Sequence, residues 1–133
     1  MKASIILLAF AIAGAAAALP ANADILKGDR FITAMKDNTV SGKAGNGTAY
    51  NEYFLPGGIA TYTDATGARV DGHWQLDSGG DVCVTWRQSV PVSQGCFRVT
   101  EHGPTLSWEQ KSAQANVTLR GGVTTTYLTR AAP

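Results

Sequence analysis

The stretch DVCVTWRQSVPVSQGCFRV, residues 81–99, contains both cysteines of the chain and one of its three tryptophans. Apolar side chains alternate with other residues on both sides of a central loop, as in two strands that each have one buried face. An antiparallel hairpin that pairs Val82 with Phe97 also places Cys83 directly opposite Cys96. Directly opposed residues have Cβ atoms about 4.5–5.5 Å apart, close to the separation that a disulfide needs. The stretch therefore predicts a disulfide-linked hairpin.

Two other roles for the cysteines fit the sequence less well. A redox pair typically has the Cys-x-x-Cys spacing, which this chain lacks. A zinc site needs two further ligands, and the only histidines, His73 and His102, do not fall at a recognisable ligand spacing. A disulfide that closes a loop of this length stabilises a fold by about 3 kcal/mol. We therefore expect a structural disulfide, and neither a metal ion nor a cofactor.

The rest of the hairpin predicts an ion pair and a contact surface. Its register places Asp81 opposite Arg98 on the cysteine face, as an exposed ion pair. The loop between the strands, residues 87–94, is held at both ends by the hairpin, so ordering it against a partner costs little entropy. An ordinary long hairpin loop is the alternative. The candidate contact residues, which include two valines expected to be exposed, are Arg87, Val90, Pro91 and Val92.

The N-terminal segment has the features of a secretory signal peptide. Lys2 precedes an apolar run over residues 5–19, and residues 21–23 are Ala-Asn-Ala, the small-x-small pattern of a cleavage site. A membrane anchor is the alternative, but the run is shorter than the roughly 20 residues of a membrane-spanning helix. We expect residues 1–23 to be removed. The remaining residues, 24–133, are then a single β-rich domain in the periplasm or secreted by a bacterium.

The charge balance of the chain argues against a highly charged partner. There are 11 Lys and Arg residues against 10 Asp and Glu, and one of the basic residues belongs to the expected signal peptide. Proteins bind nucleic acids and anionic membranes through clustered Lys and Arg. The sequence has no such cluster, and no later apolar run is long enough to span a bilayer. We therefore expect no nucleic-acid partner and no membrane insertion.

The spacing of apolar residues predicts one short helix followed by many strands. Apolar side chains at three- and four-residue spacing predict a helix over Asp29–Met35. Beyond it, runs rich in β-branched and aromatic residues alternate with glycine-containing turns about every ten residues. We expect a mainly β fold, an antiparallel meander that forms an open or closed small barrel. The predicted strands are residues 49–55, 59–64, 68–76, 81–86, 95–101, 105–110 and 124–130.

Alternation along these strands distinguishes a core face from an outer face. Glu52 falls on the same face as two aromatic residues of its run. We favour an edge strand that exposes this face over a carboxylate that points into a barrel. The aromatic side chains on core faces either pack the interior or line a pocket in a barrel mouth. These core or pocket candidates are Tyr50, Phe54, Trp74, Trp86 and Trp108.

The sequence offers one pair of residues with catalytic chemistry. Asp71 and His73 lie two residues apart on one strand face, an arrangement in which a carboxylate can orient a general base. No serine or cysteine nucleophile with a recognisable motif accompanies them. We therefore favour a solvated strand face, assign no catalytic residue and expect a protein that is not an enzyme.

The order of several short motifs resembles a group of small exported bacterial proteins of unknown function. The motifs are Tyr53-Phe54 with Gly57-Gly58, Gly72-His73-Trp74, Cys83-Val84-Thr85-Trp86 and Cys96-Phe97-Arg98-Val99. The resemblance implies an exported β-domain with one disulfide and carries over no catalytic residue. More distantly, the chain is similar to periplasmic lipocalin-like inhibitors of secreted metalloproteases. The N-terminal segment that those inhibitors insert into the protease has no match here.

These observations favour a non-catalytic binding module in the periplasm or outside the cell. Its expected partner is an envelope or secreted protein, or a small apolar ligand. The alternative is an inhibitor of a secreted or periplasmic hydrolase. An enzyme that uses the Asp71 and His73 pair is the third hypothesis.

Overall fold

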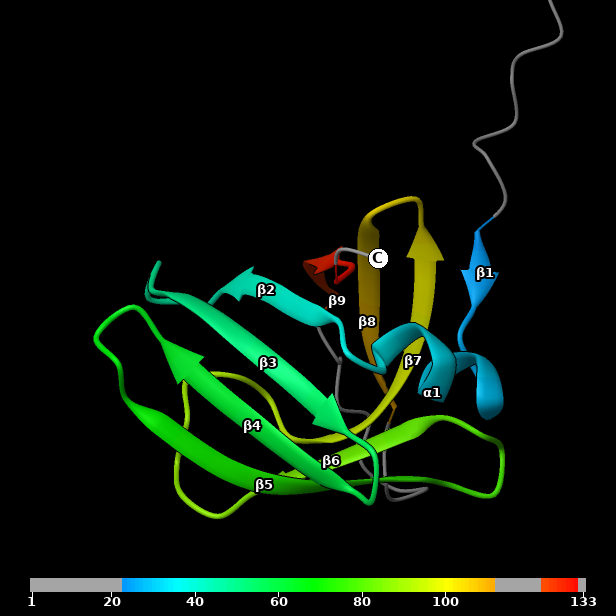
Figure 1. The fold of residues 1–133 in the computed structure, drawn as a ribbon, viewed down its shortest axis with the longest axis horizontal. Coiled ribbons are helices and arrows are strands. Elements are labelled where there is room, and N and C mark those ends of the chain that lie inside the picture. The colour runs from blue at the N-terminus through cyan, green and yellow to red at the C-terminus, as the bar shows by residue number, and fades with distance from the viewer. Residues whose placement is uncertain (1–22, 112–122, 132–133) are drawn as a thin grey trace, which may run out of the picture.

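The chain folds into a closed antiparallel barrel of eight strands, with one short helix near its N-terminus (Figure 1). The computed structural model describes residues 23–111 and 123–131, so the predicted signal peptide lies outside them except for residue 23. No helix in these ranges is long and apolar enough to cross a membrane. The elements are β1 (Asp24–Ile25), α1 (Asp29–Met35), β2 (Thr39–Lys43), β3 (Ala49–Leu55), β4 (Ile59–Asp64), β5 (Arg69–Leu76), β6 (Val82–Trp86), β7 (Gly95–His102), β8 (Thr105–Lys111) and β9 (Val123–Thr129).

The barrel is a meander whose ends meet. From β2 to β9 each strand pairs with the next along the chain, and β9 also pairs with β2, which closes the sheet. The short β1 adds to β7 through Asp24 and Ile25, beyond the part of β7 that pairs with β6. The predicted antiparallel meander is confirmed, and of its two forms the closed barrel is observed.

The hairpin of β6 and β7 has the predicted register. Val82 pairs with Phe97, and the sulfurs of Cys83 and Cys96 form the predicted disulfide. The helix also has its predicted bounds. Alternation assigned the core faces correctly, because one row of residues along β5 to β8 is buried. These residues are Gly72, Trp74, Val82, Val84, Trp86, Phe97, Val99, Leu106 and Trp108.

The sequence reasoning missed β2, which completes the closure. Its sequence, TVSGK, has one large apolar residue and a glycine, so the pattern is a weak strand signal. Gly42 stands where the ring of Tyr50 from β3 packs. A Cβ at this position would lie 2.7 Å from the Tyr50 hydroxyl oxygen. Gly42 therefore weakens the strand signal in the sequence, and it also leaves the space in which the Tyr50 ring packs.

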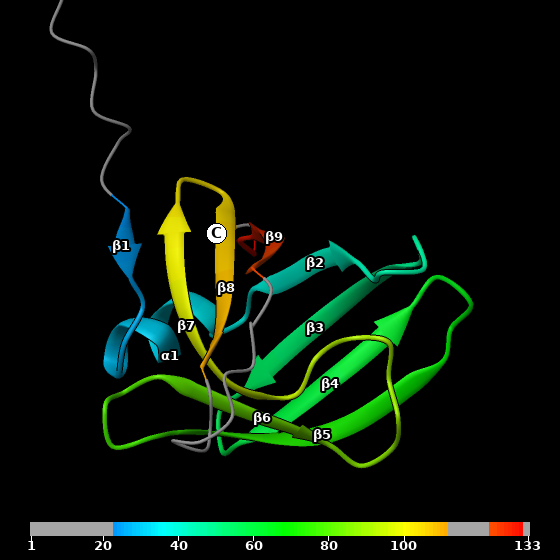
Figure 2. The same cartoon turned by 180° about the vertical axis from the view of Figure 1, so that it is seen from behind.

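The two ends of the barrel differ, as Figure 2 shows from behind. At one end, which we call the helix end, α1 leads directly into β2. Phe31 of this helix is fully buried, and its ring lies edge-on to those of Phe54, Trp74 and Trp108. At the other end, which we call the far end, lie the connections 44–48, 65–68 and 87–94. The helix thus fills one end of the barrel with an aromatic side chain.

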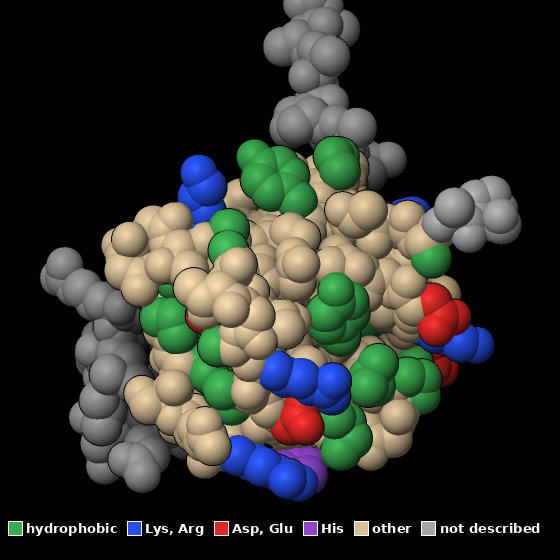
Figure 3. Space-filling view, turned by 60° about the vertical axis from the view of Figure 1, so that its left-hand side comes forward, with side chains coloured by type: hydrophobic (Ala, Val, Ile, Leu, Met, Phe, Trp, Pro, Cys, Tyr) green, Lys and Arg blue, Asp and Glu red, His purple; other side chains and the backbone are tan. Residues whose placement is uncertain are grey.

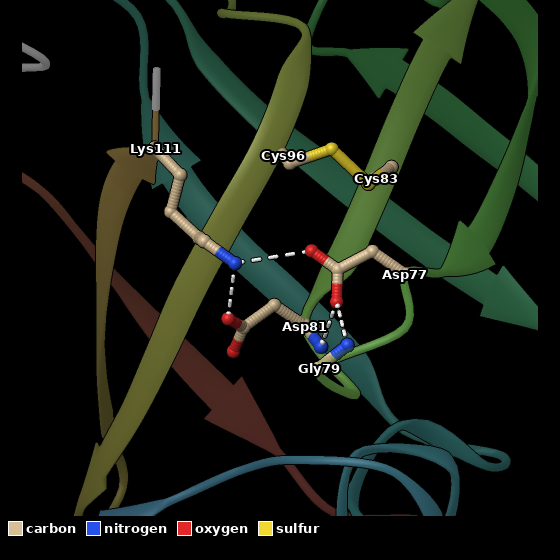
Figure 4. Close-up of polar contacts among 6 residues, drawn as sticks. All are labelled: Asp77, Gly79, Asp81, Cys83, Cys96 and Lys111. Carbon is tan, nitrogen blue, oxygen red and sulfur yellow. Dashed lines mark hydrogen bonds and ion pairs between the residues drawn. A yellow bond between two sulfur atoms is a disulfide. The ribbon is translucent and has the colours of Figure 1, made fainter. Parts of the chain in front are cut away.

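The exposed ion pair predicted between Asp81 and Arg98 is wrong. The side chain of Asp81 is only 1% exposed, and its Oδ2 accepts a hydrogen bond of 2.6 Å from the ammonium of Lys111 (Figure 4). The same ammonium lies 3.0 Å from Oδ2 of Asp77. The other oxygen of Asp77 accepts hydrogen bonds from the backbone N–H groups of Gly79 and Asp81. Lys111 of β8 lies opposite Cys96 of β7, and its long side chain reaches across β7 to the carboxylate that precedes β6.

A substitution of Gly72 tests the close packing of β5 against β6. A Cβ at Gly72 would overlap the carbonyl oxygen of Thr85 and would lie 2.8 Å from Cε3 of Trp86. We expect Gly72→Ala to lower the free energy of unfolding by about 2 kcal/mol, because backbone on a neighbouring strand cannot yield as a flexible side chain can. Gly45→Ala is the control, since a Cβ there meets nothing within 4 Å. Urea denaturation of both variants checks this, and an equal effect would contradict it.

Candidate binding site inside the barrel

A small, partly open cavity lies in the half of the barrel that faces the far end. Its volume is about 40 Å³, enough for a few water molecules. Strands β3, β6, β7, β8 and β9 line it, and the 87–94 loop covers part of it. The lining residues are Tyr50, Glu52, Val84, Trp86, Val92, Ser93, Phe97, Trp108, Thr124 and Thr126.

Glu52 puts a carboxyl group into this cavity, which corrects the edge-strand interpretation. Strand β3 is not an edge, because it pairs with β2 on one side and with β4 on the other. Tyr50, Glu52 and Phe54 alternate along it and are all buried. Glu52 is 9% exposed. The inward carboxylate, which the sequence analysis ranked second, is therefore the one that the fold produces.

The surroundings of Glu52 disfavour its ionised form. Its neighbours on the adjoining strands are Val40 of β2 and Tyr62 of β4. Among the described residues, Glu52 forms no hydrogen bond and no ion pair. Burial raises the pKa of its carboxyl group to about 7. Buried polar groups in native proteins are normally hydrogen-bonded, so a carboxyl group in this state calls for an explanation.

Two further polar groups lie buried near Glu52. The Tyr62 hydroxyl and the Trp86 indole N–H have no hydrogen-bond partner within the described ranges. Tyr62 stacks on Tyr50, and its ring lies edge-on to that of Trp86, so the three aromatic residues form one group. The indole N–H of Trp108, by contrast, donates a hydrogen bond of 2.8 Å to Oγ1 of Thr126. The interior thus holds unused hydrogen-bonding capacity beside a carboxyl group.

A second hollow lies against the cavity, under the 87–94 loop. It has a volume of about 400 Å³ and shares Trp86 and Val92 with the inner cavity. Its other lining residues are Arg87, Gln88, Ser89, Val90 and Gln94. The loop is tied down, because the Gln94 side-chain oxygen accepts a hydrogen bond from the Trp86 backbone N–H. We call this hollow the loop groove.

The four candidate contact residues of the loop divide into two kinds. Arg87 and Pro91 are exposed. Val90 and Val92 are half-buried and pack against the hydrophobic core, so the expectation of two exposed valines is wrong. Apolar side chains of a loop are buried when an apolar surface of the core lies close enough to contact. Val92 thus contributes to the walls of both the inner cavity and the loop groove.

The five aromatic candidates extend from the cavity to the helix end, and Trp108 belongs to both groups because it also packs on Phe31 and Phe54. Tyr50, Trp86 and Trp108 line the cavity. Phe54 and Trp74 pack with Phe31 toward the helix end, and the indole N–H of Trp74 donates to the carbonyl oxygen of Leu55. The sequence placed all five on core faces. It did not show which of them line the cavity and which pack around Phe31 at the helix end.

Asp71 and His73 lie on the outer face of β5. Asp71 accepts hydrogen bonds from Arg69 Nε at 3.1 Å and from the Thr61 hydroxyl, and these contacts lower the pKa of its carboxyl group. Nε2 of His73 lies 3.5 Å from the guanidinium of Arg87. Figure 3 shows basic, acidic and histidine side chains together on this face, with apolar side chains beside them. The carboxylate is thus engaged by Arg69 and Thr61 rather than by the imidazole.

Within the described ranges, one trio of side chains has the spacing of metal ligands. It combines Asp77 with Cys83 and Cys96. The two sulfurs are bonded to each other, and a metal ligand must be a thiolate. Asp77 is in turn engaged by Lys111. This trio is therefore a structural cluster beside the disulfide (Figure 4).

Fold and site together define a class: a small, closed, disulfide-linked β-barrel with a carboxyl group inside. Eight-stranded barrels have interiors that side chains fill or that hold one small ligand. No family model matches the chain, and no curated protein matches it significantly. The structural features above are therefore what the functional argument rests on.

The pKa of Glu52 makes stability depend on pH. The folded state holds the carboxyl proton to about pH 7, whereas the unfolded chain releases it near pH 4.5. Unfolding between these values releases a proton, so stability falls as pH rises toward 7 and is constant above it. We expect a loss of about 2 kcal/mol between pH 5 and pH 7. In Glu52→Gln this loss should disappear. Urea denaturation across this range checks the expectation, and parallel profiles for both proteins would contradict it.

Proposed function

We propose that the protein is a binding module whose ligand enters the barrel from the far end. The observation that carries this proposal is the buried carboxyl group of Glu52 beside an interior cavity. An isolated buried carboxyl group costs stability unless something compensates for it, so its presence is best explained by what it binds. The unused N–H of Trp86 and hydroxyl of Tyr62 support the same view.

The volumes limit the kind of ligand. Typical sites for drug-sized molecules occupy about 300–1,000 Å³, whereas the inner cavity has about 40 Å³. A large apolar molecule does not fit there. The loop groove is ten times larger and adjoins it at Trp86 and Val92. We propose a ligand with a small head group in the cavity and a longer body in the groove.

We also propose that the module is exported and does not catalyse a reaction. The disulfide fits an oxidising compartment such as the periplasm or the cell exterior. The Asp71 carboxylate is held by Arg69, so it does not orient His73 as a general base. A small molecule is the partner that the cavity favours over an envelope or secreted protein.

Native mass spectrometry of protein purified from the cells that produce it tests the proposal. We expect an added mass that disappears on denaturation. Val92→Phe should lose this mass, because Val92 lines both hollows and the larger ring takes up space that the ligand needs. Ile25→Phe is the matched control, since Ile25 is exposed on β1 and lines neither the cavity nor the groove. A bare protein mass, or equal effects of both variants, would contradict an interior ligand.

The same preparation separates the module from a hydrolase inhibitor. We expect no inhibition when the protein is titrated against secreted proteases of each class and lysozyme. Nanomolar inhibition of any of them, unchanged in Val92→Phe, would overturn the binding module in favour of the inhibitor.

A further inference from the structure

We infer that the cavity recognises the protonated head of a primary amine, with Glu52 as the residue that determines this specificity. This inference rests on the proposed function and names the chemical class of the ligand. Of the described residues that line the cavity, only Glu52 and Tyr50 are titratable, and burial keeps Tyr50 neutral, so Glu52 is the one acidic group that ionises near neutral pH. The described part of the lining therefore offers an acidic group and no positive side chain beside it, and a cationic ligand supplies the missing charge.

The walls of the cavity suit a cation. The rings of Tyr50, Trp86 and Trp108 line it, and aromatic rings attract ammonium groups through their negative faces. Hydroxyl oxygens of Ser93 and Thr124 are available in the lining as hydrogen-bond acceptors. An ammonium group has three N–H donors, and a carboxylate together with hydroxyls provides acceptors for them. An anionic head would face Glu52, and no described residue of the lining offers it a cation.

The size of the cavity selects a compact head. A volume of about 40 Å³ accepts a group of a few heavy atoms, which an ammonium on a methylene chain satisfies. A quaternary ammonium with its methyl groups is larger. The chain behind the head passes between Trp86 and Val92 into the loop groove, where Gln88 and Ser89 offer polar contacts. The geometry thus favours a primary amine with an extended polar or short aliphatic body.

Recognition of an ammonium depends on the protonation of Glu52. The titratable groups that face Glu52 are Tyr50 on its own strand and Tyr62 on β4, while β2 presents the apolar Val40. Burial raises the pKa of both tyrosines, so they stay neutral at physiological pH. The bound ammonium requires the carboxylate form, so binding releases the carboxyl proton below pH 7. Affinity should rise about tenfold between pH 6 and pH 8, as Glu52 becomes ionised.

Three probes of similar length test the inference: n-butylammonium, 1-butanol and butyrate. Binding is measured by tryptophan fluorescence, because Trp86 and Trp108 line the cavity. We expect n-butylammonium to bind best, and about tenfold more tightly at pH 8 than at pH 6. Glu52→Gln should weaken its binding at least tenfold and remove the pH dependence. Glu109→Gln is the control, because Glu109 lies exposed on the outer face of β8.

The outcomes separate the inference from the proposed function. If 1-butanol or butyrate binds as tightly as the amine, or if Glu52→Gln has no effect, the amine inference is overturned while the binding module stands. If none of the probes binds but an added mass is found on the native protein, the amine inference is again overturned and the binding module stands. If no probe binds and no added mass is found, both fail.

Discussion

Phe31→Ala is expected to lower the free energy of unfolding by about 4 kcal/mol. Phe31 is 0% exposed, and three aromatic rings from β3, β5 and β8 surround it. These rings belong to rigid strands of a closed barrel, so they cannot collapse into the space that the lost ring leaves. The cost therefore includes both the lost burial and the cavity. Urea denaturation followed by tryptophan fluorescence measures the change.

Ile32→Ala is the matched control in the same helix. Ile32 is 37% exposed and faces away from the barrel interior. We expect its substitution to cost well under 1 kcal/mol, because little surface leaves or enters water. Equal losses for the two variants would mean that α1 stabilises the fold through helix formation alone. That result would contradict the role of the Phe31 side chain in filling the helix end of the barrel.

Lys111→Met should cost about 3 kcal/mol. The substitution keeps the length of the side chain and removes the ammonium, so Asp81 is left as a buried carboxylate without its cation. Removing one partner of a buried ion pair is more costly than removing an exposed pair, because the remaining charge stays desolvated. The expected cost is at the low end for such pairs, since Lys111 itself is 35% exposed. Thermal and urea denaturation give the measurement.

Arg98→Met provides the sharpest comparison. The strand register places Arg98 opposite Asp81, yet the structure gives it no ion pair with that carboxylate. We expect this variant to change stability by less than about 0.5 kcal/mol, as exposed charges usually do. If Arg98→Met lowered the free energy of unfolding more than Lys111→Met, then Arg98, and not Lys111, would be the residue that neutralises Asp81.

Prediction from the sequence succeeded for the features that depend on a short local pattern. Alternation along each strand and the pairing of Cys83 with Cys96 depend only on the period of the β-strand and on one hairpin register. The bounds of α1 follow from a similar short-range signal. Strand β2 was not predicted because Gly42 weakens the alternation of its sequence. The structure shows why a glycine is there: it leaves room for the ring of Tyr50.

The candidate site was predicted in its parts but not as a whole. The sequence placed Tyr50, Trp86 and Trp108 on core faces, and it noted the inward option for Glu52. Strand β3 is an inner strand because β2, which the sequence reasoning missed, pairs with it on the side away from β4. The valines of the loop were expected in solvent because a loop sequence does not show which core surface lies beneath it. A cavity is a property of side chains from five strands, so no single segment encodes it.

By itself the sequence determined the strand faces, the hairpin disulfide and the helix, because each depends on neighbours within a few residues or on one register. Only the tertiary structure decided three other features: that the sheet closes, that Lys111 reaches across β7 to Asp81, and that Glu52 faces a cavity. The physical reason is the same for all three. Each depends on side chains that no single local pattern covers: β9 pairs with β2 in the closure, Lys111 of β8 reaches Asp81 before β6, and five strands line the cavity.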